Sequence, residues 1–383
     1  MPEVSFQLNG HPTTVSYEDE MHFLEVLREC CGITSAKDGC APQGVCGCCT
    51  ILLNGKPALA CQLDPAKAGD AEVVTLEGLP ERQRQLLAST FAHEGAVQCG
   101  FCTPGIAVRA AHLINKGMTA NRDRIERGLA GHLCRCTGYH RIVDAIQSAG
   151  EASQGVSDVG DGLPRRSNYF GEDYGLERAS EVPRNNGVGA SPERYRGQDQ
   201  TLGTKEFVAD MAEEGMLHGA LVLSDHPRAR VLKIETSRAS NLSGVERILT
   251  AEDIPGVCNH GLLIPDWPLL VAQGETTRYI GDVLAVVVAD SQHHARTAAG
   301  AVDVEYEVLA PVPTAKAALS ADAPLIHTGG NLLEVCAFSR GSVDAALDDA
   351  AFVVEETFVT QRIEHAFLEP EASLASPSGA GGL

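Results

Sequence analysis

The sequence contains no uninterrupted apolar stretch of about eighteen residues, the length that a membrane-spanning helix needs, which excludes such a helix. Its first residues, MPEVSFQLNG, lack the basic and apolar regions of a secretory signal peptide, so we expect a cytoplasmic protein. Basic residues are also scarce, since 30 Lys and Arg stand against 51 Asp and Glu in 383 residues, a formal net charge of −21. This acidic excess disfavours nucleic acid and anionic membrane surfaces as partners.

Cysteine, by contrast, is abundant, with 13 residues. Eleven of them lie within the first 136 residues, and only Cys258 and Cys336 follow. A cytosolic protein rarely holds so many cysteines as disulfides, so their number favours metal or redox chemistry. The charge is uneven too, because residues 1–150 carry 13 basic and 16 acidic residues, whereas residues 151–383 carry 17 and 35. Two modules of different character are therefore joined in this chain.

Residues 1–78 are predicted to form a small β-rich domain. Apolar and polar residues alternate at its start, and Asn9-Gly10 then provides the tight turn of a β-hairpin. Helical spacing of apolar residues predicts a helix over residues 20–31, and a short strand is expected at Thr50–Leu53. Strands, one helix and a cysteine-rich loop are the parts of a ferredoxin-like β-grasp fold.

Residues 79–150 instead show helical patterns separated by cysteine-bearing turns. Thr103-Pro104 is typical of a helix start, with Thr103 as the N-cap residue and Pro104 at the first helical position. This segment is therefore predicted to form a small four-helix bundle. Its helices are expected at residues 81–92, 103–117, 121–129 and 139–148.

The composition changes again in the second half of the chain. Residues 151–200 are rich in Gly, Ser, Asp, Asn and Arg and lack apolar periodicity, which is typical of a solvated linker. Residues 201–312 are predicted to form a mixed α/β domain, and residues 313–383 to connect it to a further region. The clearest elements expected in the α/β domain are strands at 217–223, 283–288 and 302–308 and a helix at 293–301.

The first cysteine motif is Cys40-x5-Cys46-x2-Cys49-x11-Cys61. Plant-type 2Fe–2S ferredoxins use nearly this arrangement, C-x4-C-x2-C with a distant fourth cysteine, although the first gap here is one residue longer. Glycines between the cysteines allow the tight backbone turns that are needed to wrap a cluster. Cys48 is a rival ligand, but Cys49 keeps the expected two-residue gap from Cys46.

The second motif is Cys99-x2-Cys102-x31-Cys134-x-Cys136. Two close pairs, brought together by a helical bundle, would place four thiols around one centre. A structural zinc site is the physical alternative, although zinc sites normally use C-x2–4-C pairs rather than the C-x-C found here. The ferredoxin-like motif earlier in the chain favours iron–sulfur over zinc.

Several segments carry a resemblance to a known family. GCAPQGVCGCCTILLNGKPALAC, QCGFCTPG and HLCRCTGYHRIVDAI resemble the iron–sulfur portion of the molybdenum hydroxylases, which include xanthine dehydrogenases and aldehyde oxidoreductases. GMLHGALVLSDHPRARV, TAEDIPG, YIGDVLAVVVAD and VDVEYEVL resemble the α/β hammerhead domain of the family's molybdenum subunit. EHAFLEPEASLA, within residues 313–383, resembles the start of the molybdenum-binding region.

The resemblance implies an α+β multidomain protein with two 2Fe–2S clusters. The outer set, which would bind the cluster nearer solvent and the electron acceptor, is Cys40, Cys46, Cys49 and Cys61. The inner set, which would bind the cluster beside molybdopterin, is Cys99, Cys102, Cys134 and Cys136. Gln98, directly before the inner set, matches a position that can hydrogen-bond the pterin in relatives; a polar residue that satisfies a local helix end is the alternative.

In this family the molybdenum centre adds a water-derived oxygen to an aldehyde or N-heterocycle, and the two electrons released leave singly through two clusters. The resemblance therefore implies an iron–sulfur electron-transfer subunit of a xanthine dehydrogenase-like oxidoreductase that hydroxylates purines or related N-heterocycles. An aldehyde oxidoreductase subunit is one alternative, and a non-catalytic zinc-binding scaffold is another.

Beyond the start of the molybdenum-binding region, we expect this sequence to lack nearly all of the family's molybdopterin contacts, and no flavin domain is visible between the iron–sulfur and hammerhead parts. Molybdopterin is therefore expected in, or shared with, a molybdopterin-binding partner chain, and FAD on another subunit of a heteromeric complex. A truncated product is the alternative to a natural subunit.

Some residues outside the motifs have simpler explanations. Cys30-Cys31 ends an amphipathic helix, so both are expected to be buried, inert thiols. His293-His294 is expected on a solvated helix face. His365 and Glu369 could be mistaken for a metal-binding pair on a helix, but the family match favours a structural or pocket-adjacent role.

Overall fold

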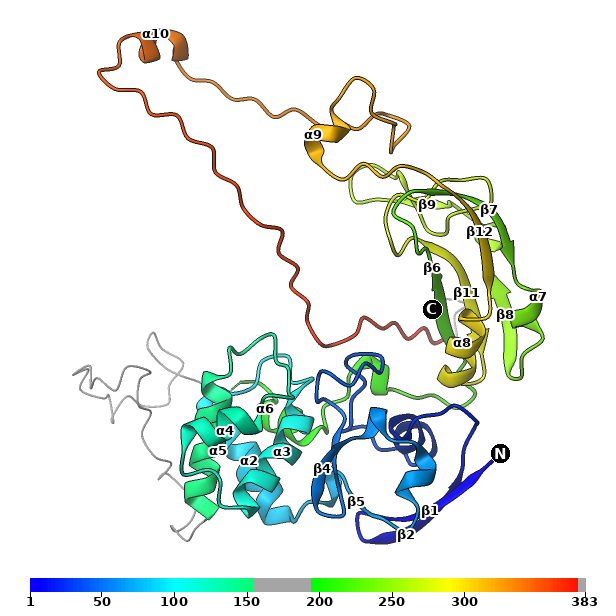
Figure 1. Ribbon diagram of the computed structural model, residues 1–383, viewed down its shortest axis with the longest axis vertical. Helices are drawn as coiled ribbons and strands as arrows, with labels where there is room; N and C mark the ends of the chain where they lie inside the picture. Colours follow the sequence, from blue (N-terminus) through cyan, green and yellow to red (C-terminus); the bar gives the residue numbers. More distant parts are fainter. Residues whose placement is uncertain (154–193, 378–383) are drawn as a thin grey trace. The chain divides into compact units, whose positions relative to one another are not determined.

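The computed structural model describes residues 1–153 and 194–377 (Figure 1). The chain divides into two compact units, of which the first is Met1–Met211 with Ile363–Leu383 and the second is Ala212–Arg362. Most of the predicted linker lies outside the described residues. No helix in the described part of the chain is both long and apolar enough to cross a bilayer.

A five-stranded sheet opens the first unit, in the order β2-β1-β5-β3-β4. Strand β1 runs parallel to β5, and the other neighbours are antiparallel. Asn9-Gly10 forms the predicted hairpin turn, with φ angles of 52° and 85°. The strand predicted at Thr50–Leu53 is confirmed as β3. The five strands are β1 Glu3–Leu8, β2 His11–Ser16, β3 Thr50–Leu53, β4 Lys56–Leu59 and β5 Glu72–Val74.

Short helical segments cover and connect this sheet. Helix α1, Phe23–Glu25, continues directly into the π-helical segment η1, Val26–Cys30, within the range predicted for one helix. The rings of Phe6 and Phe23 pack edge to face at 5.2 Å, which fixes this segment on the sheet. The connecting 3-10 helices are η2 Ala60–Gln62, η3 Pro65–Ala68 and η4 Leu76–Gly78.

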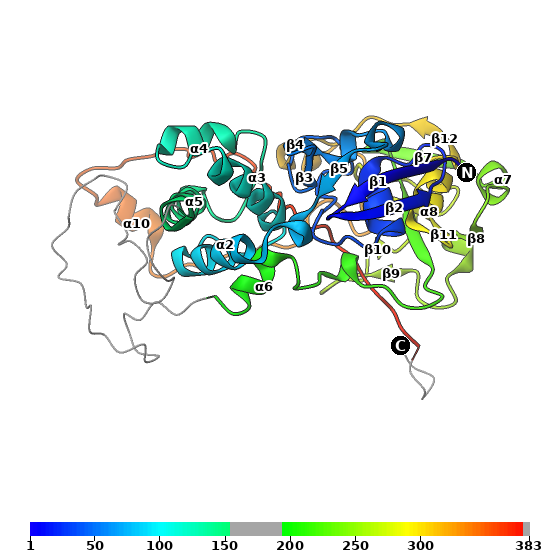
Figure 2. The same ribbon diagram turned by 90° about the horizontal axis from the view of Figure 1, so that it is seen from below.

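Four longer helices lie beside the sheet (Figure 2). Helix α3 is the central one, because it contacts α2, α4 and α5 as well as strands β3 and β4. The N-cap of α3 is Cys102, so the prediction that Thr103 caps this helix is wrong by one residue. The helices are α2 Glu81–Glu94, α3 Thr103–Asn115, α4 Arg122–Gly128 and α5 His140–Ser153.

One apolar core joins these helices to the sheet. Leu52 of β3 belongs to the same buried cluster as Phe91 of α2, Ile106 of α3 and Ile146 of α5. Each fully buried Leu, Ile or Phe side chain contributes about 1.5–3 kcal/mol to folding. This shared core also contains Cys102, so it fixes the cysteine-bearing loop at the start of α3 relative to the sheet.

Gly105 lies where α3 meets the first cysteine loop. A Cβ atom on Gly105 would lie 2.5 Å from the Gly47 carbonyl oxygen and 2.9 Å from that of Cys48. Because both are backbone atoms that cannot rotate away, Gly105→Ala is expected to lower the free energy of unfolding by about 1–3 kcal/mol. Gly131→Ala is the control, because its Cβ would meet no atom within 4 Å. Urea denaturation compares the two, and equal losses would contradict this close approach.

Residues 194–211, which we call the strap, return to the first unit. They contain helix α6, Gly197–Leu202, and the 3-10 helix η5, Val208–Asp210. Helix α6 packs against α2 and α3 and buries Gln200 and Thr201. Both described ends of the predicted linker are therefore helical, since α5 also extends to Ser153.

The second unit combines a three-stranded sheet, β6-β11-β8, with the pairs β7–β12 and β9–β10. The three strands and the helix predicted for this region are present as β6, β11, β12 and α8. The strands are β6 His218–Leu223, β7 Ala229–Glu235, β8 Val245–Leu249, β9 Asn259–His260, β10 Trp267–Pro268, β11 Val283–Ala289 and β12 Asp303–Val308. The helices are α7 Ser237–Ser240, η6 Ala251–Asp253, α8 Gln292–Ala299, α9 Ala315–Ala318 and α10 Val343–Asp348.

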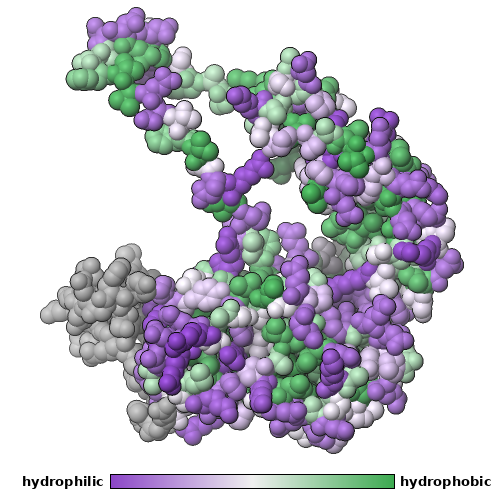
Figure 3. Space-filling view, in the orientation of Figure 1, coloured by the Kyte–Doolittle hydropathy of each residue, from purple (hydrophilic) through white to green (hydrophobic). Residues whose placement is uncertain are grey.

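Residues 319–362 of the second unit leave many apolar side chains uncovered. Phe338 and Phe352 are each 91% exposed, and Phe358 is 89% exposed. Figure 3 shows apolar surface of this kind around α10. Contiguous apolar surface on a soluble protein marks a region that packs against another part or partner.

Candidate iron–sulfur sites

The outer set lies at one edge of the sheet. Cys40, Cys46 and Cys49 are on the loop between η1 and β3, and Cys61 comes from η2, beyond the β3–β4 hairpin. The sulfur of Cys46 is hydrogen-bonded to that of Cys40, and the sulfur of Cys49 to that of Cys61. The four predicted ligands are thus brought together as two pairs.

Left-handed backbone turns shape this loop. Gly44 and Gly47 have φ angles of 72° and 73°, a conformation that favours glycine. A Cβ atom on Gly47 would lie 2.5 Å from the Gly131 carbonyl oxygen, so this position also needs glycine because of close approach. Gln62 closes the loop, since its amide donates to the Pro42 carbonyl at 2.7 Å and to the Cys61 sulfur at 3.7 Å.

The inner set lies at the ends of the helices. Cys99 and Cys102 are on the loop between α2 and α3, and Cys134 and Cys136 are on the loop between α4 and α5. The Cys136 and Cys99 sulfurs are 3.6 Å apart, and the Cys102 thiol hydrogen-bonds the Cys134 sulfur. These four cysteines also form two pairs, each joining one loop to the other.

Two residues that the sequence reasoning missed support the inner set. The Tyr139 hydroxyl accepts from the Cys134 backbone N–H at 2.9 Å and donates to the His132 carbonyl at 3.0 Å. The Thr137 hydroxyl lies 3.1 Å from the Cys134 sulfur. Both residues stand within the motif HLCRCTGYH, but their roles depend on how the loop folds.

Hydrogen bonds within the sulfur pairs lower the pKa of some of the thiols, which favours the thiolate form that binds metal. The hydrogen bond from Cys102 lowers the pKa of Cys134 to about 5, and that from Cys49 lowers the pKa of Cys61 to about 7. Burial raises the pKa of Cys99 to about 11. Because the thiolate is the form that binds metal, each set presents at least one ready ligand at neutral pH.

Cys48, the rival of Cys49 as a ligand, has a different set of contacts. It is fully buried, and its thiol hydrogen-bonds the sulfur of Cys46, which lowers the pKa of Cys46 to about 6. The same hydrogen bond is the main reason why the pKa of Cys48 itself is raised. Cys48 therefore supports Cys46, whereas Cys49 pairs with Cys61.

The two cysteine loops are joined directly. The Leu133 backbone N–H donates to the Cys46 carbonyl at 2.8 Å, and Leu133 is the neighbour of Cys134. The buried His132 ring nitrogen Nε2 lies 3.0 Å from the Thr50 hydroxyl. One backbone hydrogen bond thus connects a residue of the outer set to the loop of the inner set.

This donor arrangement fits a two-iron cluster. A 2Fe–2S cluster takes four cysteine sulfurs, two on each iron, whereas zinc needs four donors around one point. Each set offers four cysteine sulfurs arranged as two pairs, which matches the donors of a two-iron cluster.

The remaining predicted residues are placed as follows. The Gln98 side chain is exposed beside Cys99. Cys30 is exposed and Cys31 half-buried, so the expectation of two buried thiols is wrong for Cys30. His293 is buried, so it does not lie on the solvated face that its position predicted. His365 lies in an extended segment, where its carbonyl accepts a hydrogen bond from the Arg135 side chain.

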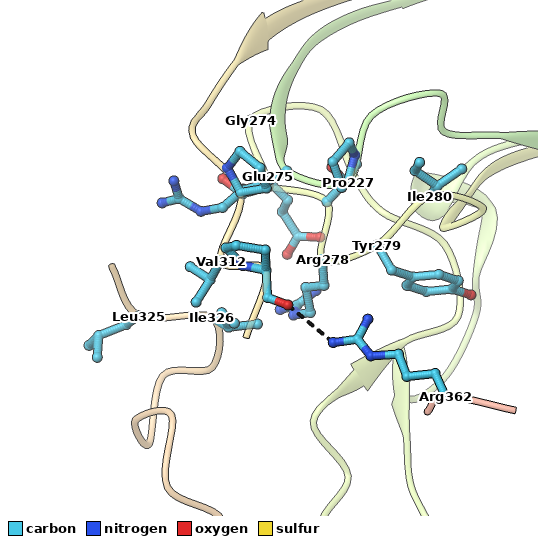
Figure 4. Close-up of a pocket in the computed structure, with 15 residues that line it drawn as sticks. Pro227, Gly274, Glu275, Arg278, Tyr279, Ile280, Val312, Leu325, Ile326 and Arg362 are labelled. Carbon is cyan, nitrogen blue, oxygen red and sulfur yellow. Dashed lines mark hydrogen bonds between the residues drawn. The ribbon is translucent and has the colours of Figure 1, made fainter. Parts of the chain in front are cut away.

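A cavity of about 740 Å³ lies in the second unit (Figure 4). Arg278 points into it, and Arg362 closes one side by donating to the Pro313 carbonyl at 3.1 Å. Tyr279 and Ile280 form part of its apolar wall. Tyr279 and Ile280 belong to the segment YIGDVLAVVVAD that carries the sequence resemblance, and none of the candidate cluster cysteines lines this cavity.

Three protein families match consecutive parts of the chain. The 2Fe–2S binding domain family matches residues 75–147. The a/b hammerhead domain of aldehyde oxidase and xanthine dehydrogenase matches residues 202–310. The molybdopterin cofactor-binding domain family matches residues 326–383.

Among curated proteins, the small FeS subunit of nicotinate dehydrogenase from Eubacterium barkeri is 39% identical over 149 residues, which covers 39% of this chain and 94% of that subunit. The chain belongs to the molybdenum hydroxylase family. This finding confirms the resemblance noted in the sequence. The large molybdopterin subunit of the same dehydrogenase is 36% identical over 177 residues, covering 46% of this chain and 41% of that subunit.

A relative that matches nearly the whole chain is aldehyde oxidoreductase from Megalodesulfovibrio gigas, 31% identical over 388 aligned positions. The match covers 96% of this chain but only 41% of that enzyme. Among solved structures, the aldehyde oxidoreductase from Desulfovibrio gigas superimposes with a TM-score of 0.70 at 29% identity, covering 86% of this chain and 36% of that one. These molybdenum hydroxylase relatives are oxidoreductases.

Proposed function

We propose that this chain is the iron–sulfur electron-transfer part of a molybdenum hydroxylase. In this proposal Cys40, Cys46, Cys49 and Cys61 bind one 2Fe–2S cluster, and Cys99, Cys102, Cys134 and Cys136 bind the second. The observation that carries the proposal is the arrangement of both sets as two sulfur pairs, because a two-iron cluster needs two sulfurs on each iron.

We propose the following domains for this function. Residues 1–78 are a ferredoxin-like β-grasp domain, which the mixed sheet with β1 parallel to β5 supports. Residues 79–150 are a four-helix 2Fe–2S domain, 201–312 a hammerhead domain, and 313–383 a connector with the start of the molybdenum-binding region. Residues 151–200 serve as the linker, apart from the helical ends described above.

When bound, each cluster would supply a one-electron carrier, so that the pair handles a two-electron oxidation in single steps. The protein's own residues hold these sites and keep water away. Cys46 and Cys102 are buried, and Thr137 and Gln62 offer hydrogen bonds to sulfur, which help to set the reduction potential. The hydrogen bond from Leu133 to the Cys46 carbonyl gives a short route between the two sets.

The proposal also includes partners. Molybdopterin would be bound in, or shared with, a molybdopterin-binding chain, and FAD would lie on another subunit. The uncovered apolar side chains of residues 319–362 support packing against such a partner. Gln98, exposed beside Cys99, would hydrogen-bond the pterin. In the Eubacterium barkeri relative, the names themselves assign iron–sulfur and molybdopterin to separate subunits.

We propose purines or related N-heterocycles as the substrate class. Relatives named nicotinate dehydrogenase and xanthine dehydrogenase iron-sulfur-binding subunit, 39% identical each, support this choice. Aldehydes are the second candidate, because aldehyde oxidoreductase matches 96% of the chain in one alignment. Assaying the complete complex with xanthine, nicotinate and an aliphatic aldehyde distinguishes these candidates.

The proposed function predicts an electron count. Anaerobic titration of the purified chain with dithionite should take up about two electrons per chain, one for each cluster, and produce two paramagnetic signals. Uptake of a single electron would remove one of the two sets from the proposal. A colourless chain that takes up none would contradict the function as a whole.

A further inference from the structure

The strap, residues 194–211, contacts both cysteine-bearing regions from one short segment. Its helix α6 lies beside α2 and α3 in the first unit (Figure 1). Its Gln200 reaches the Cys99 loop, and its Asp210 reaches Lys37, three residues before Cys40. The strap, which joins the end of the predicted linker (194–200) to residues 201–211, thus contacts the loops of both sets.

Gln200 makes the most direct contact with the inner set. Its side-chain amide nitrogen donates to the Cys99 carbonyl at 2.7 Å and to the Gln98 carbonyl at 3.3 Å. Its amide oxygen accepts from Arg194 at 3.0 Å. Because Gln200 is only 1% exposed, water cannot replace these hydrogen bonds, and both of its amide N–H groups are used as donors.

The shape of the Cys99 loop depends on the same side chain. Gly100 has a φ of 88°, and a Cβ atom there would lie 2.8 Å from the Cβ of Gln200. Gln200 therefore fills the space beside Gly100, which has no side chain. Cys99 and Gly100 are held both by hydrogen bonds and by packing.

The other end of the strap secures the same loop from a second side. The Phe207 ring packs edge to face with Phe101, between Cys99 and Cys102 in sequence, at a centroid distance of 5.3 Å. Lys37 lies 5.0 Å from the same ring centroid and pairs with Asp210. The α2–α3 loop, which carries Cys99 and Cys102, therefore packs between Gln200 and Phe207.

We propose that Gln200 is a positioning residue for Cys99 of the inner set. By holding the Gln98 and Cys99 carbonyls, it orients the Cys99 sulfur and the backbone N–H groups that follow it. Backbone groups aimed at cluster sulfurs tune the reduction potential and spectrum. The effect on a cluster rests on the proposed function, whereas the effect on the loop does not.

The test uses the full chain with Gln200→Met, which keeps the side-chain length and removes the amide. Gln200→Glu, which keeps the shape but cannot donate two hydrogen bonds at neutral pH, is the second variant. Asp199→Asn is the control, because Asp199 is on the same helix and its carboxylate pairs with the exposed Arg196 at 2.9 Å. Hydrogen exchange of the amides of residues 99–103 and the paramagnetic spectra of both clusters are measured.

Both Gln200 variants should speed exchange at residues 99–103 by roughly tenfold, because two buried hydrogen bonds are lost. They should also shift the g values and the midpoint potential of the inner cluster and leave those of the outer cluster unchanged. The Asp199→Asn control should change the signals of neither cluster. Unchanged exchange and an unchanged inner signal would overturn the proposal, as would equal shifts of both clusters. If the unsubstituted chain holds no iron, the proposed function fails, while hydrogen exchange still decides the role of Gln200.

Discussion

Replacing Cys134 by serine is expected to halve the iron content of the purified chain, from about four atoms to about two, because a serine hydroxyl stays protonated where the thiol ionises. The hydrogen bond from Cys102, which joins the two loops, lowers the pKa of Cys134 to about 5. The loss should also lower the thermal stability of helices α2 to α5, because ligation joins the α2–α3 loop to the α4–α5 loop. Iron analysis and thermal denaturation followed by circular dichroism measure both effects.

Two further substitutions make this experiment specific. Cys46→Ser should remove the other half of the iron and the outer signal, with a smaller effect on the helices. Cys258→Ser is the matched control, since Cys258 is an exposed cysteine in the second unit and belongs to neither set. Full iron content in the Cys134→Ser variant would refute the assignment of the inner set.

Replacing Asp210 by alanine is expected to lower the free energy of unfolding of the first unit by about 3–5 kcal/mol, because it leaves a buried charge without its partner. The side chains of Asp210 and Lys37 are each 1% exposed, and Arg28 also contacts Asp210 at 2.8 Å. Urea denaturation of the full chain measures the loss. Asp199→Ala removes an exposed ion pair instead and should cost about 0–1 kcal/mol. Similar losses for both variants would contradict a buried network.

The pKa of Asp210 predicts how the difference in free energy of unfolding between the unsubstituted chain and Asp210→Ala depends on pH. Burial alone would raise the pKa of Asp210, but the hydrogen bond and charge of Lys37, together with Arg28, lower it below the ordinary value of 3.8. A carboxylate whose pKa is lower in the folded state stabilises the fold above the unfolded pKa, and this contribution is lost as the pH falls through the folded pKa. The gap between the unsubstituted chain and Asp210→Ala should therefore persist at neutral pH and shrink below about pH 4.

Local patterns in the sequence predicted much of this fold. The hairpin at Asn9-Gly10, strand β3 and helices α2 to α5 depend on residues close together in the chain, so spacing and turn residues were sufficient. The composition of the cysteine motifs likewise indicated two sets of four. Which sulfur pairs with which could not be predicted, because Cys99 meets Cys136 only after α4 and α5 return to the α2–α3 loop.

The strap was not predictable from local pattern. Gln200 hydrogen-bonds residues about a hundred positions earlier in the chain, and no periodic apolar pattern marks α6 in its polar surroundings. The burial of His293 escaped prediction for a related reason, because tertiary packing rather than the sequence neighbours decides which residues of α8 are covered. Residues such as Thr137 and Tyr139 needed the folded loop before a role could be assigned.

The most direct test of the account is metal and sulfide analysis of the chain purified without oxygen. Two 2Fe–2S clusters predict about four irons and about four acid-labile sulfides per chain, with no stoichiometric zinc. A chain that contains zinc and no sulfide would instead make these eight cysteines structural and contradict the electron-transfer role.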